Sequence, residues 1–180
     1  MTQDMLPSSD EGAGAESMPP TPSTPSFELV FRPSVALITI VRRFVSEFYS
    51  RVVDDADVAG RLALATHELL ENAAKYTTGG ETYLHVDLDR ESGVVTVRTR
   101  NRTDPARIAV LVGSFEALGR AADPGVLYNS MLRRSALQAH GSGLGLARIR
   151  SEGEMTLELV VSGELVEINA RGLVQKRGES

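Results

Sequence analysis

Two short segments about seventy residues apart contain side chains that could bind a nucleotide. In the first, a helical spacing would place Glu68, Asn72 and Lys75 one turn apart on the same face. A carboxylate and a carboxamide at this spacing can hold a water molecule and a Mg²⁺ ion side by side. The second segment, residues 141–146 (GSGLGL), is a glycine-rich turn before an expected helix, whose backbone N–H groups can hold phosphate oxygens. Together, the two segments predict a site for a magnesium-bound nucleotide.

Each of the two segments also has an ordinary structural interpretation. Glu68, Glu71 and Lys75 could form ion pairs along a solvent-exposed helix, because residues three and four apart lie side by side there. The glycines of residues 141–146 could form a flexible turn that holds no ligand. The sequence favours a nucleotide site because both segments occur in one chain, each on or beside an expected helix.

The spacing of apolar residues predicts the elements that position these segments. Apolar residues three and four apart indicate amphipathic helices, and alternation of apolar with polar residues indicates strands. Asp54 or Asp55 should cap the helix that carries Glu68, and residues 77–80 (TTGG) should end it. The expected order is strand 27–32, helices 33–52 and 55–76, strands 81–89 and 94–101, helices 105–118 and 124–139, a short helix ending at Arg150, and strands 155–162 and 165–172.

This order of elements predicts an α+β fold. Because the strands come in hairpins, the sheet should be mixed but mostly antiparallel, and the apolar helix stripes need one sheet face to cover. We therefore expect a two-layer sandwich in which helices cover one face of the sheet. The other face should be more polar, since Thr96, Arg98 and Arg100 alternate with apolar residues along one strand.

Composition limits the class of protein. A chain of 180 residues with 42% hydrophobic content can bury one core. It contains no cysteine, which excludes disulfides and thiolate metal sites. The longest apolar run, residues 35–41, is far shorter than the roughly 20 residues that span a bilayer. We therefore expect a cytoplasmic protein that does not enter a membrane.

The first 26 residues differ from the rest of the chain. They hold five of the eight prolines and four acidic residues without a lysine or arginine. We expect residues 1–26 to be a disordered proline- and serine-rich leader, residues 27–174 a single domain and residues 175–180 a flexible tail. The remaining 20 acidic and 19 basic residues nearly balance, so nucleic acid is not an expected partner. Arg148 and Arg150 are interpreted either as part of a solvated face or as charges at a helix C-terminus.

The two segments resemble motifs of the GHKL ATPases, the superfamily that includes gyrase and the histidine kinases. Glu68 and Asn72, followed by Lys75 and Tyr76, resemble its N-box, and residues 141–146 resemble its second glycine box. The order, spacing and setting of the motifs match over about residues 30–170. The small anti-sigma-factor serine kinases and related histidine-kinase-like ATPases are most similar, because they too are single short domains.

The resemblance implies roles for individual residues, with ATP and Mg²⁺ as cofactors. The residue matching Glu68 is the catalytic one, which polarises the attacking hydroxyl or water. The residue matching Asn72 binds Mg²⁺. The resemblance places the following residues at the nucleotide: Asn72, Lys75, Asn101, Gly141, Ser142, Gly143, Leu144 and Gly145.

The first glycine box of the family, Asp-x-Gly-x-Gly, is missing. Asn101 stands where the adenine-binding aspartate would be, and no glycine follows it before Pro105. A carboxamide can still accept a hydrogen bond from the adenine amino group. However, Arg102 and Thr103 now occupy positions where the family brings backbone close to the nucleotide. The sequence therefore leaves ATP binding open.

Three functions are compatible with these sequence features. We favour a bacterial regulatory protein similar to anti-sigma-factor serine/threonine kinases, which acts by partner switching on a STAS-type anti-anti-sigma protein or a sigma factor. The second is a binding module of the same fold with weakened or lost nucleotide binding. The third is a histidine-kinase catalytic domain acting in trans. Residues 106–139 would form the lid region, and whether the protein is a homodimer stays open.

Overall fold

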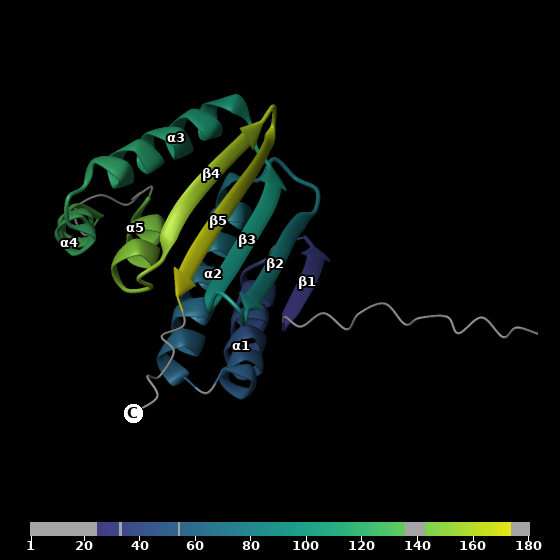
Figure 1. Ribbon diagram of the computed structural model, residues 1–180. Helices are drawn as coiled ribbons and strands as arrows, with labels where there is room; N and C mark the ends of the chain where they lie inside the picture. Colours follow the sequence, from purple (N-terminus) through teal and green to yellow (C-terminus); the bar gives the residue numbers. More distant parts are fainter. Residues whose placement is uncertain (1–24, 33, 54, 136–142, 174–180) are drawn as a thin grey trace, which may run out of the picture.

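The computed structural model describes residues 25–32, 34–53, 55–135 and 143–173 (Figure 1). Within these ranges the chain forms five strands and five helices. The elements are β1 (Ser26–Phe31), α1 (Val35–Val52), α2 (Ala56–Tyr76), β2 (Thr82–Asp89), β3 (Val94–Arg102), α3 (Pro105–Arg120), α4 (Pro124–Ser135), α5 (Leu144–Ser151), β4 (Thr156–Ser162) and β5 (Leu165–Leu173).

The strands form one sheet with the order β1-β2-β3-β5-β4, and each pairing between neighbours is antiparallel. Helices α1 and α2 lie behind this sheet, and α3, α4 and α5 are grouped beyond its β4 edge (Figure 1). The expected α+β two-layer sandwich, with helices on one sheet face, is therefore confirmed, while the sheet, expected to be mixed, is antiparallel at each of these pairings. None of the helices in the described ranges has the length and apolar character needed to cross a bilayer.

A single core lies between the sheet and the helices. It is built where the apolar face of the strands meets the apolar stripe of α2, so that Leu62 and Leu69 pack with Val86 and Val97. Burial of each such side chain contributes about 1.5–3 kcal/mol to folding. Ile149 of α5 belongs to the same core, which fixes α5 next to α2. This packing sets the positions of the two candidate segments.

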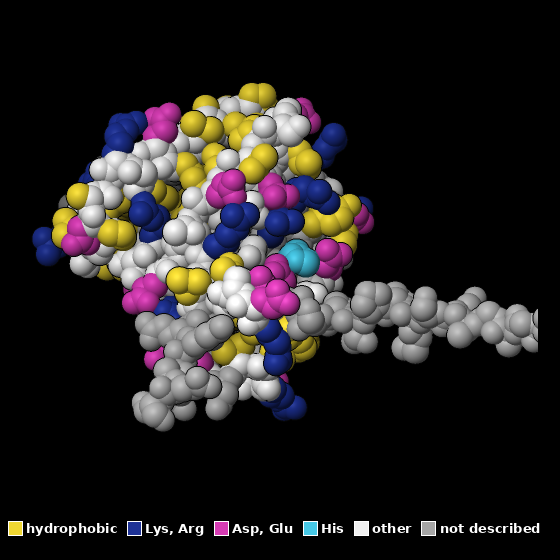
Figure 2. Space-filling model, viewed as in Figure 1, with side chains coloured by type: hydrophobic (Ala, Val, Ile, Leu, Met, Phe, Trp, Pro, Cys, Tyr) yellow, Lys and Arg dark blue, Asp and Glu magenta, His cyan; other side chains and the backbone are white. Residues whose placement is uncertain are grey.

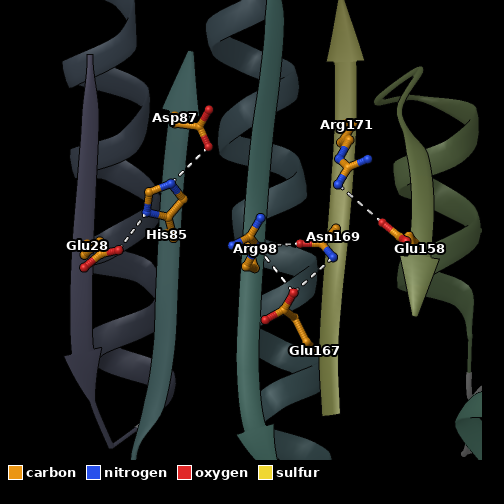
Figure 3. Close-up of polar contacts among 8 residues, drawn as sticks. All are labelled: Glu28, His85, Asp87, Arg98, Glu158, Glu167, Asn169 and Arg171. Carbon is orange, nitrogen blue, oxygen red and sulfur yellow. Dashed lines mark hydrogen bonds and ion pairs between the residues drawn. The ribbon is translucent and has the colours of Figure 1, made fainter. Parts of the chain in front are cut away.

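The outward face of the sheet is polar, as expected. Charged side chains gather over its middle in the space-filling view (Figure 2). His85 of β2 lies 3.1 Å from Glu28 of the neighbouring strand β1 and 3.0 Å from Asp87 of its own strand (Figure 3). Arg98 of β3 donates to Asn169 of the neighbouring strand β5 at 2.7 Å. Acidic and basic side chains therefore lie within ion-pair distance of each other on this face.

Side-chain caps fix the start of the helix that carries Glu68. Asp55 accepts hydrogen bonds from the backbone N–H groups of Asp57 and Val58, at 2.9 and 3.2 Å, and is the N-cap of α2. Asp54, the other expected cap, lies outside the described residues. The helix ends at Tyr76, before the TTGG segment.

Some element boundaries differ from expectation. β1 begins at Ser26, inside the expected leader, and α3 continues to Arg120 rather than ending near residue 118. α4 is described up to Ser135, and the last four residues of the expected helix 124–139 lie outside the described ranges. Residues 1–24 of the expected leader and the tail 175–180 also lie outside them.

Candidate functional site

Six of the nine residues expected at the site line one cavity of about 690 Å³. Helices α1, α2, α4 and α5 form its walls. The six residues are Glu68, Asn72, Lys75, Gly143, Leu144 and Gly145. The first three come from α2 and the last three from the glycine turn and the start of α5, so the two segments that lie far apart in sequence face each other.

The glycine turn opens α5 directly onto this cavity. Gly143 is the N-cap residue of α5 with φ +88°, a left-handed conformation that side chains rarely adopt, and no side chain of a described residue caps the helix. A β-carbon here would also lie 3.2 Å from Oγ of Ser114 and 3.3 Å from Cε of Met131. The uncapped N–H groups of a helix start are a place where an anion can bind. Gly141 and Ser142, also expected at the site, lie outside the described residues.

Glu68 is held by an ion pair across the cavity wall. Its side chain is 11% exposed, and its Oε1 accepts a hydrogen bond from Nη1 of Arg148 at 3.1 Å. Its other oxygen, Oε2, lies so close to Gly145 that a β-carbon at position 145 would collide with it. The carboxylate of Glu68 therefore lies at the first turn of α5, between Gly145 and Arg148.

Arg148 joins this carboxylate to a second one. Nε of Arg148 donates to Oε2 of Glu152 at 2.7 Å, and this hydrogen bond raises the pKa of Arg148 above its ordinary value. Tyr128 of α4 also lines the cavity, and burial together with the charge of Glu152 raises the pKa of Tyr128. Side chains from α2, α5 and α4 are thus linked around Arg148.

Asn72 and His67 each present a buried polar atom without a partner. Nδ2 of Asn72 and Nδ1 of His67 have no hydrogen bond to any residue that the structure describes. The other ring nitrogen of His67, Nε2, lies 3.0 Å from Oε1 of Glu71. Both residues line the cavity. Buried polar groups are normally hydrogen-bonded, so these two nitrogen atoms are exceptions among the described residues of the cavity lining.

Lys75 completes the α2 side of the cavity. Its side chain is exposed, and Nζ lies 5.3 Å from the centre of the Tyr76 ring. An exposed lysine on a flexible stem can reach a phosphate in the cavity as a point charge.

Asn101 does not line this cavity. It is 7% exposed near the end of β3, and its Nδ2 donates to the carbonyl oxygen of the next residue, Arg102, at 3.2 Å. Its expected contact with adenine therefore stays a prediction.

The segment after β3 closes the end of α2. Oγ1 of Thr103 donates to the carbonyl oxygen of Tyr76, and Nη1 of Arg107 donates to that of Thr77 at 3.0 Å. These bonds satisfy carbonyl groups that a helix C-terminus leaves without partners. The segment after β3 thus has a structural role that explains its side chains.

The sequence interpretation correctly placed Arg148 in the last turn of a helix, but it did not place this residue at the cavity, which Arg148 lines. The available signal was its spacing. Arg148 lies three residues after Gly145, one helical turn along, so both had to face the same side of α5. Tyr128 was missed as well, since residues 106–139 gave no pattern that pointed to a site.

Comparisons with known proteins support the fold. No protein-family model matches the sequence, and no curated protein matches it. Among solved structures, a chain in the crystal structure of the SiaB–SiaC complex from Pseudomonas aeruginosa has a similar fold, with a TM-score of 0.56 and 16% sequence identity. The match covers 81% of this chain and 89% of that one. Fold and cavity together define a small α+β two-layer sandwich with a pocket between its helices that both polar and apolar residues line.

Proposed function

We propose that this protein is a regulatory protein that binds magnesium–ATP in the cavity between α2 and α5 and acts through a protein partner. One observation carries the proposal: Glu68, Asn72 and Lys75 face the glycine turn across a single cavity of about 690 Å³. This volume is in the range of typical small-molecule sites. The α+β fold supports the family resemblance seen in the sequence.

The residues of the cavity fit a magnesium-bound nucleotide. The start of α5, which no side chain of a described residue caps, offers backbone N–H groups to phosphate oxygens, and Lys75 adds a positive charge. Asn72 lines the cavity, and the oxygen of its amide is the kind of ligand that Mg²⁺ prefers. Bound Mg²⁺ would neutralise charge on the phosphates, and Asn72 is the side chain that would hold it.

The reaction that fits these groups is phosphoryl transfer to a serine or threonine of the partner. Among the described residues, two carboxylates line the cavity: Glu68, and Glu71 one turn further along α2. Glu68 is the one that lies against Gly145 at the start of α5. It would accept the proton of the attacking hydroxyl while the terminal phosphoryl group leaves ADP. This makes the protein similar in function to anti-sigma-factor serine/threonine kinases.

A protein partner is part of the proposal. The structure with a similar fold is a complex of two proteins, SiaB and SiaC. Helix α4 contains no buried residue, and Val110, Val126 and Leu132 of α3 and α4 are exposed apolar side chains. Such a surface suits a docking protein. We propose a STAS-type anti-anti-sigma protein or a sigma factor as the class of partner.

A calorimetric titration with ATP and with ADP, each with and without Mg²⁺, tests the proposal. The proposed function requires saturable binding of both nucleotides that Mg²⁺ strengthens. A matched titration with GTP measures the preference for adenine. No heat of binding at millimolar nucleotide would remove the kinase from consideration.

A second candidate is a module that keeps the fold and binds its partner without catalysis. Two contacts favour this function. Glu68, the expected catalytic residue, is already paired with Arg148, and Thr103, which lies where the family brings backbone close to the nucleotide, is bonded to the end of α2. Partner binding that is unchanged by nucleotide, with no phosphate transferred, would establish this function instead.

A further inference from the structure

The protein's own carboxylate lies where an anionic ligand would bind. Glu68 extends from α2 to the first turn of α5, where its Oε2 lies against Gly145 and its Oε1 receives Nη1 of Arg148 at 3.1 Å. A carboxylate at the start of a helix is stabilised by the same N–H groups and dipole that bind phosphate. Glu68 and a nucleotide phosphate would therefore compete for one place.

Arg148 can serve either of these two anions. A guanidinium presents a fork of N–H donors that matches carboxylate and phosphate groups equally well. The Arg148 side chain is 40% exposed and lines the cavity, so a ligand can reach it from solvent. In the resting structure the nearest anion to its Nη1 is Glu68.

Glu152 keeps the guanidinium in place during such an exchange. It binds Nε of Arg148 at 2.7 Å, whereas Glu68 binds Nη1. The two contacts use different nitrogens, so the one at Nη1 can break while the one at Nε persists. Arg148 then needs only a small movement to turn from Glu68 to a phosphate in the same cavity.

We propose that Glu68 acts as an internal anion that occupies Arg148 in the resting protein, and that the terminal phosphate of the nucleotide displaces it. After displacement, Arg148 binds the phosphate, and the Glu68 carboxylate is released to accept the proton of the attacking hydroxyl. The proposal rests on the proposed function. It assigns Arg148 as a phosphate-binding residue and makes activation of Glu68 a consequence of nucleotide binding.

A double-mutant cycle on ATP affinity tests this exchange. Glu68→Gln should tighten magnesium–ATP binding about fivefold to tenfold, because Arg148 no longer has to leave a carboxylate. Arg148→Gln should weaken ATP more than ADP, since only ATP carries the terminal phosphate. In the Arg148→Gln background, Glu68→Gln should no longer tighten binding. Arg148→Lys should fall between wild type and Arg148→Gln, since one ammonium cannot hold both contacts.

Glu71→Gln is the matched control. Glu71 lines the same cavity and its replacement removes the same charge, but its partner in the structure is His67 and not Arg148. The effect of Glu71→Gln on ATP affinity should be the same with Arg148 present or replaced. Thermal unfolding of each variant shows whether the fold is intact, and Arg148→Lys provides the measurement if Arg148→Gln does not fold.

The outcomes separate this inference from the proposed function. Tighter ATP binding by Glu68→Gln than by wild type, lost when Arg148 is replaced, would support the exchange. If Glu68→Gln tightens ATP equally in both backgrounds, or no more than Glu71→Gln does, the exchange is wrong and nucleotide binding stands. If neither wild type nor Glu68→Gln binds ATP at millimolar concentration, the exchange and the proposed function are both wrong.

Discussion

The hydroxyl of Tyr49 donates a hydrogen bond to the carbonyl oxygen of Pro25 at 3.0 Å. This bond joins the inner side of α1 to the residue before β1, and Tyr49 itself is fully buried. The backbone N–H of Leu88 donates to the same oxygen at 3.2 Å. One carbonyl group therefore connects the beginning of the domain to both α1 and β2.

The Tyr49 contact predicts a change in alkaline stability. Burial, with the negative charge of Asp87 adding to it, raises the pKa of Tyr49 in the folded protein above the value of about 10 in the unfolded chain. Its contribution is complete below about pH 10 and is lost as pH rises further, because the unfolded state releases the proton first. Tyr49→Phe should lose about 1 kcal/mol of unfolding free energy at pH 7.

Urea unfolding of wild type and Tyr49→Phe at pH 7 and pH 11 measures both effects. The deficit of Tyr49→Phe should shrink or reverse at pH 11, because the variant has no hydroxyl to ionise at this position. An equal deficit at both pH values would show that ionisation of Tyr49 does not affect folding.

The two hydrogen bonds to the carbonyl oxygen of Pro25 predict how far the chain can be shortened from its N-terminus. Removal of residues 1–24 should change the unfolding free energy by at most a few tenths of a kcal/mol, because this acidic, proline-rich segment has few apolar side chains. Removal of residues 1–26 also deletes the Pro25 acceptor and the first residue of β1, and should cost about 1 kcal/mol more. Calorimetry compares the melting temperatures. An equally large loss in both truncations would contradict the composition argument.

The spacing of apolar residues predicted the fold, because this spacing shows which face of each helix or strand is buried. The stripe along α2, with Leu62 and Leu69 on it, and the cap at Asp55 were sufficient to place Glu68, Asn72 and Lys75 on one helix face. Alternation along β3 likewise predicted which face of the sheet is polar.

The contact between Glu68 and Arg148 could not be predicted in the same way. The two residues are 80 positions apart, and their meeting depends on how α5 packs against α2. The role of Thr103 and Arg107 at the end of α2 depends on tertiary packing as well. Helix and strand patterns show which way a residue faces, but they do not identify its partner.

Two glycines with different surroundings should respond oppositely to alanine. Gly60 lies inside α2 and a β-carbon there has no atom within 4 Å, so Gly60→Ala should stabilise the protein by about 0.5–1 kcal/mol. At Gly153 a β-carbon would lie 2.5 Å from the carbonyl oxygen of Ile149, and Gly153→Ala should destabilise by about 1–3 kcal/mol. Urea unfolding measures both. A stabilising Gly153→Ala would show that the turn after α5 is looser than the structure indicates.

Substitution of Asn101 distinguishes a structural role from contact with adenine. Aspartate cannot donate to the carbonyl of Arg102, and it places a charge at a site that is 7% exposed. Asn101→Asp should therefore lower the unfolding free energy by about 1–3 kcal/mol and leave ATP affinity unchanged. Tighter ATP binding with unchanged stability would instead place Asn101 at the base, as the family resemblance implies.

The most direct test of the nucleotide site is the Mg²⁺ dependence of ATP binding in Asn72→Ala. Asn129, an exposed asparagine on α4 outside the cavity lining, provides the matched control Asn129→Ala. Calorimetric titration with ATP in Mg²⁺ and in chelator should show that wild type and Asn129→Ala bind more tightly with Mg²⁺. Asn72→Ala should fold normally and lose this difference. If Asn72→Ala keeps the full Mg²⁺ effect, or if wild type has none, the cavity between α2 and α5 is not a magnesium–nucleotide site.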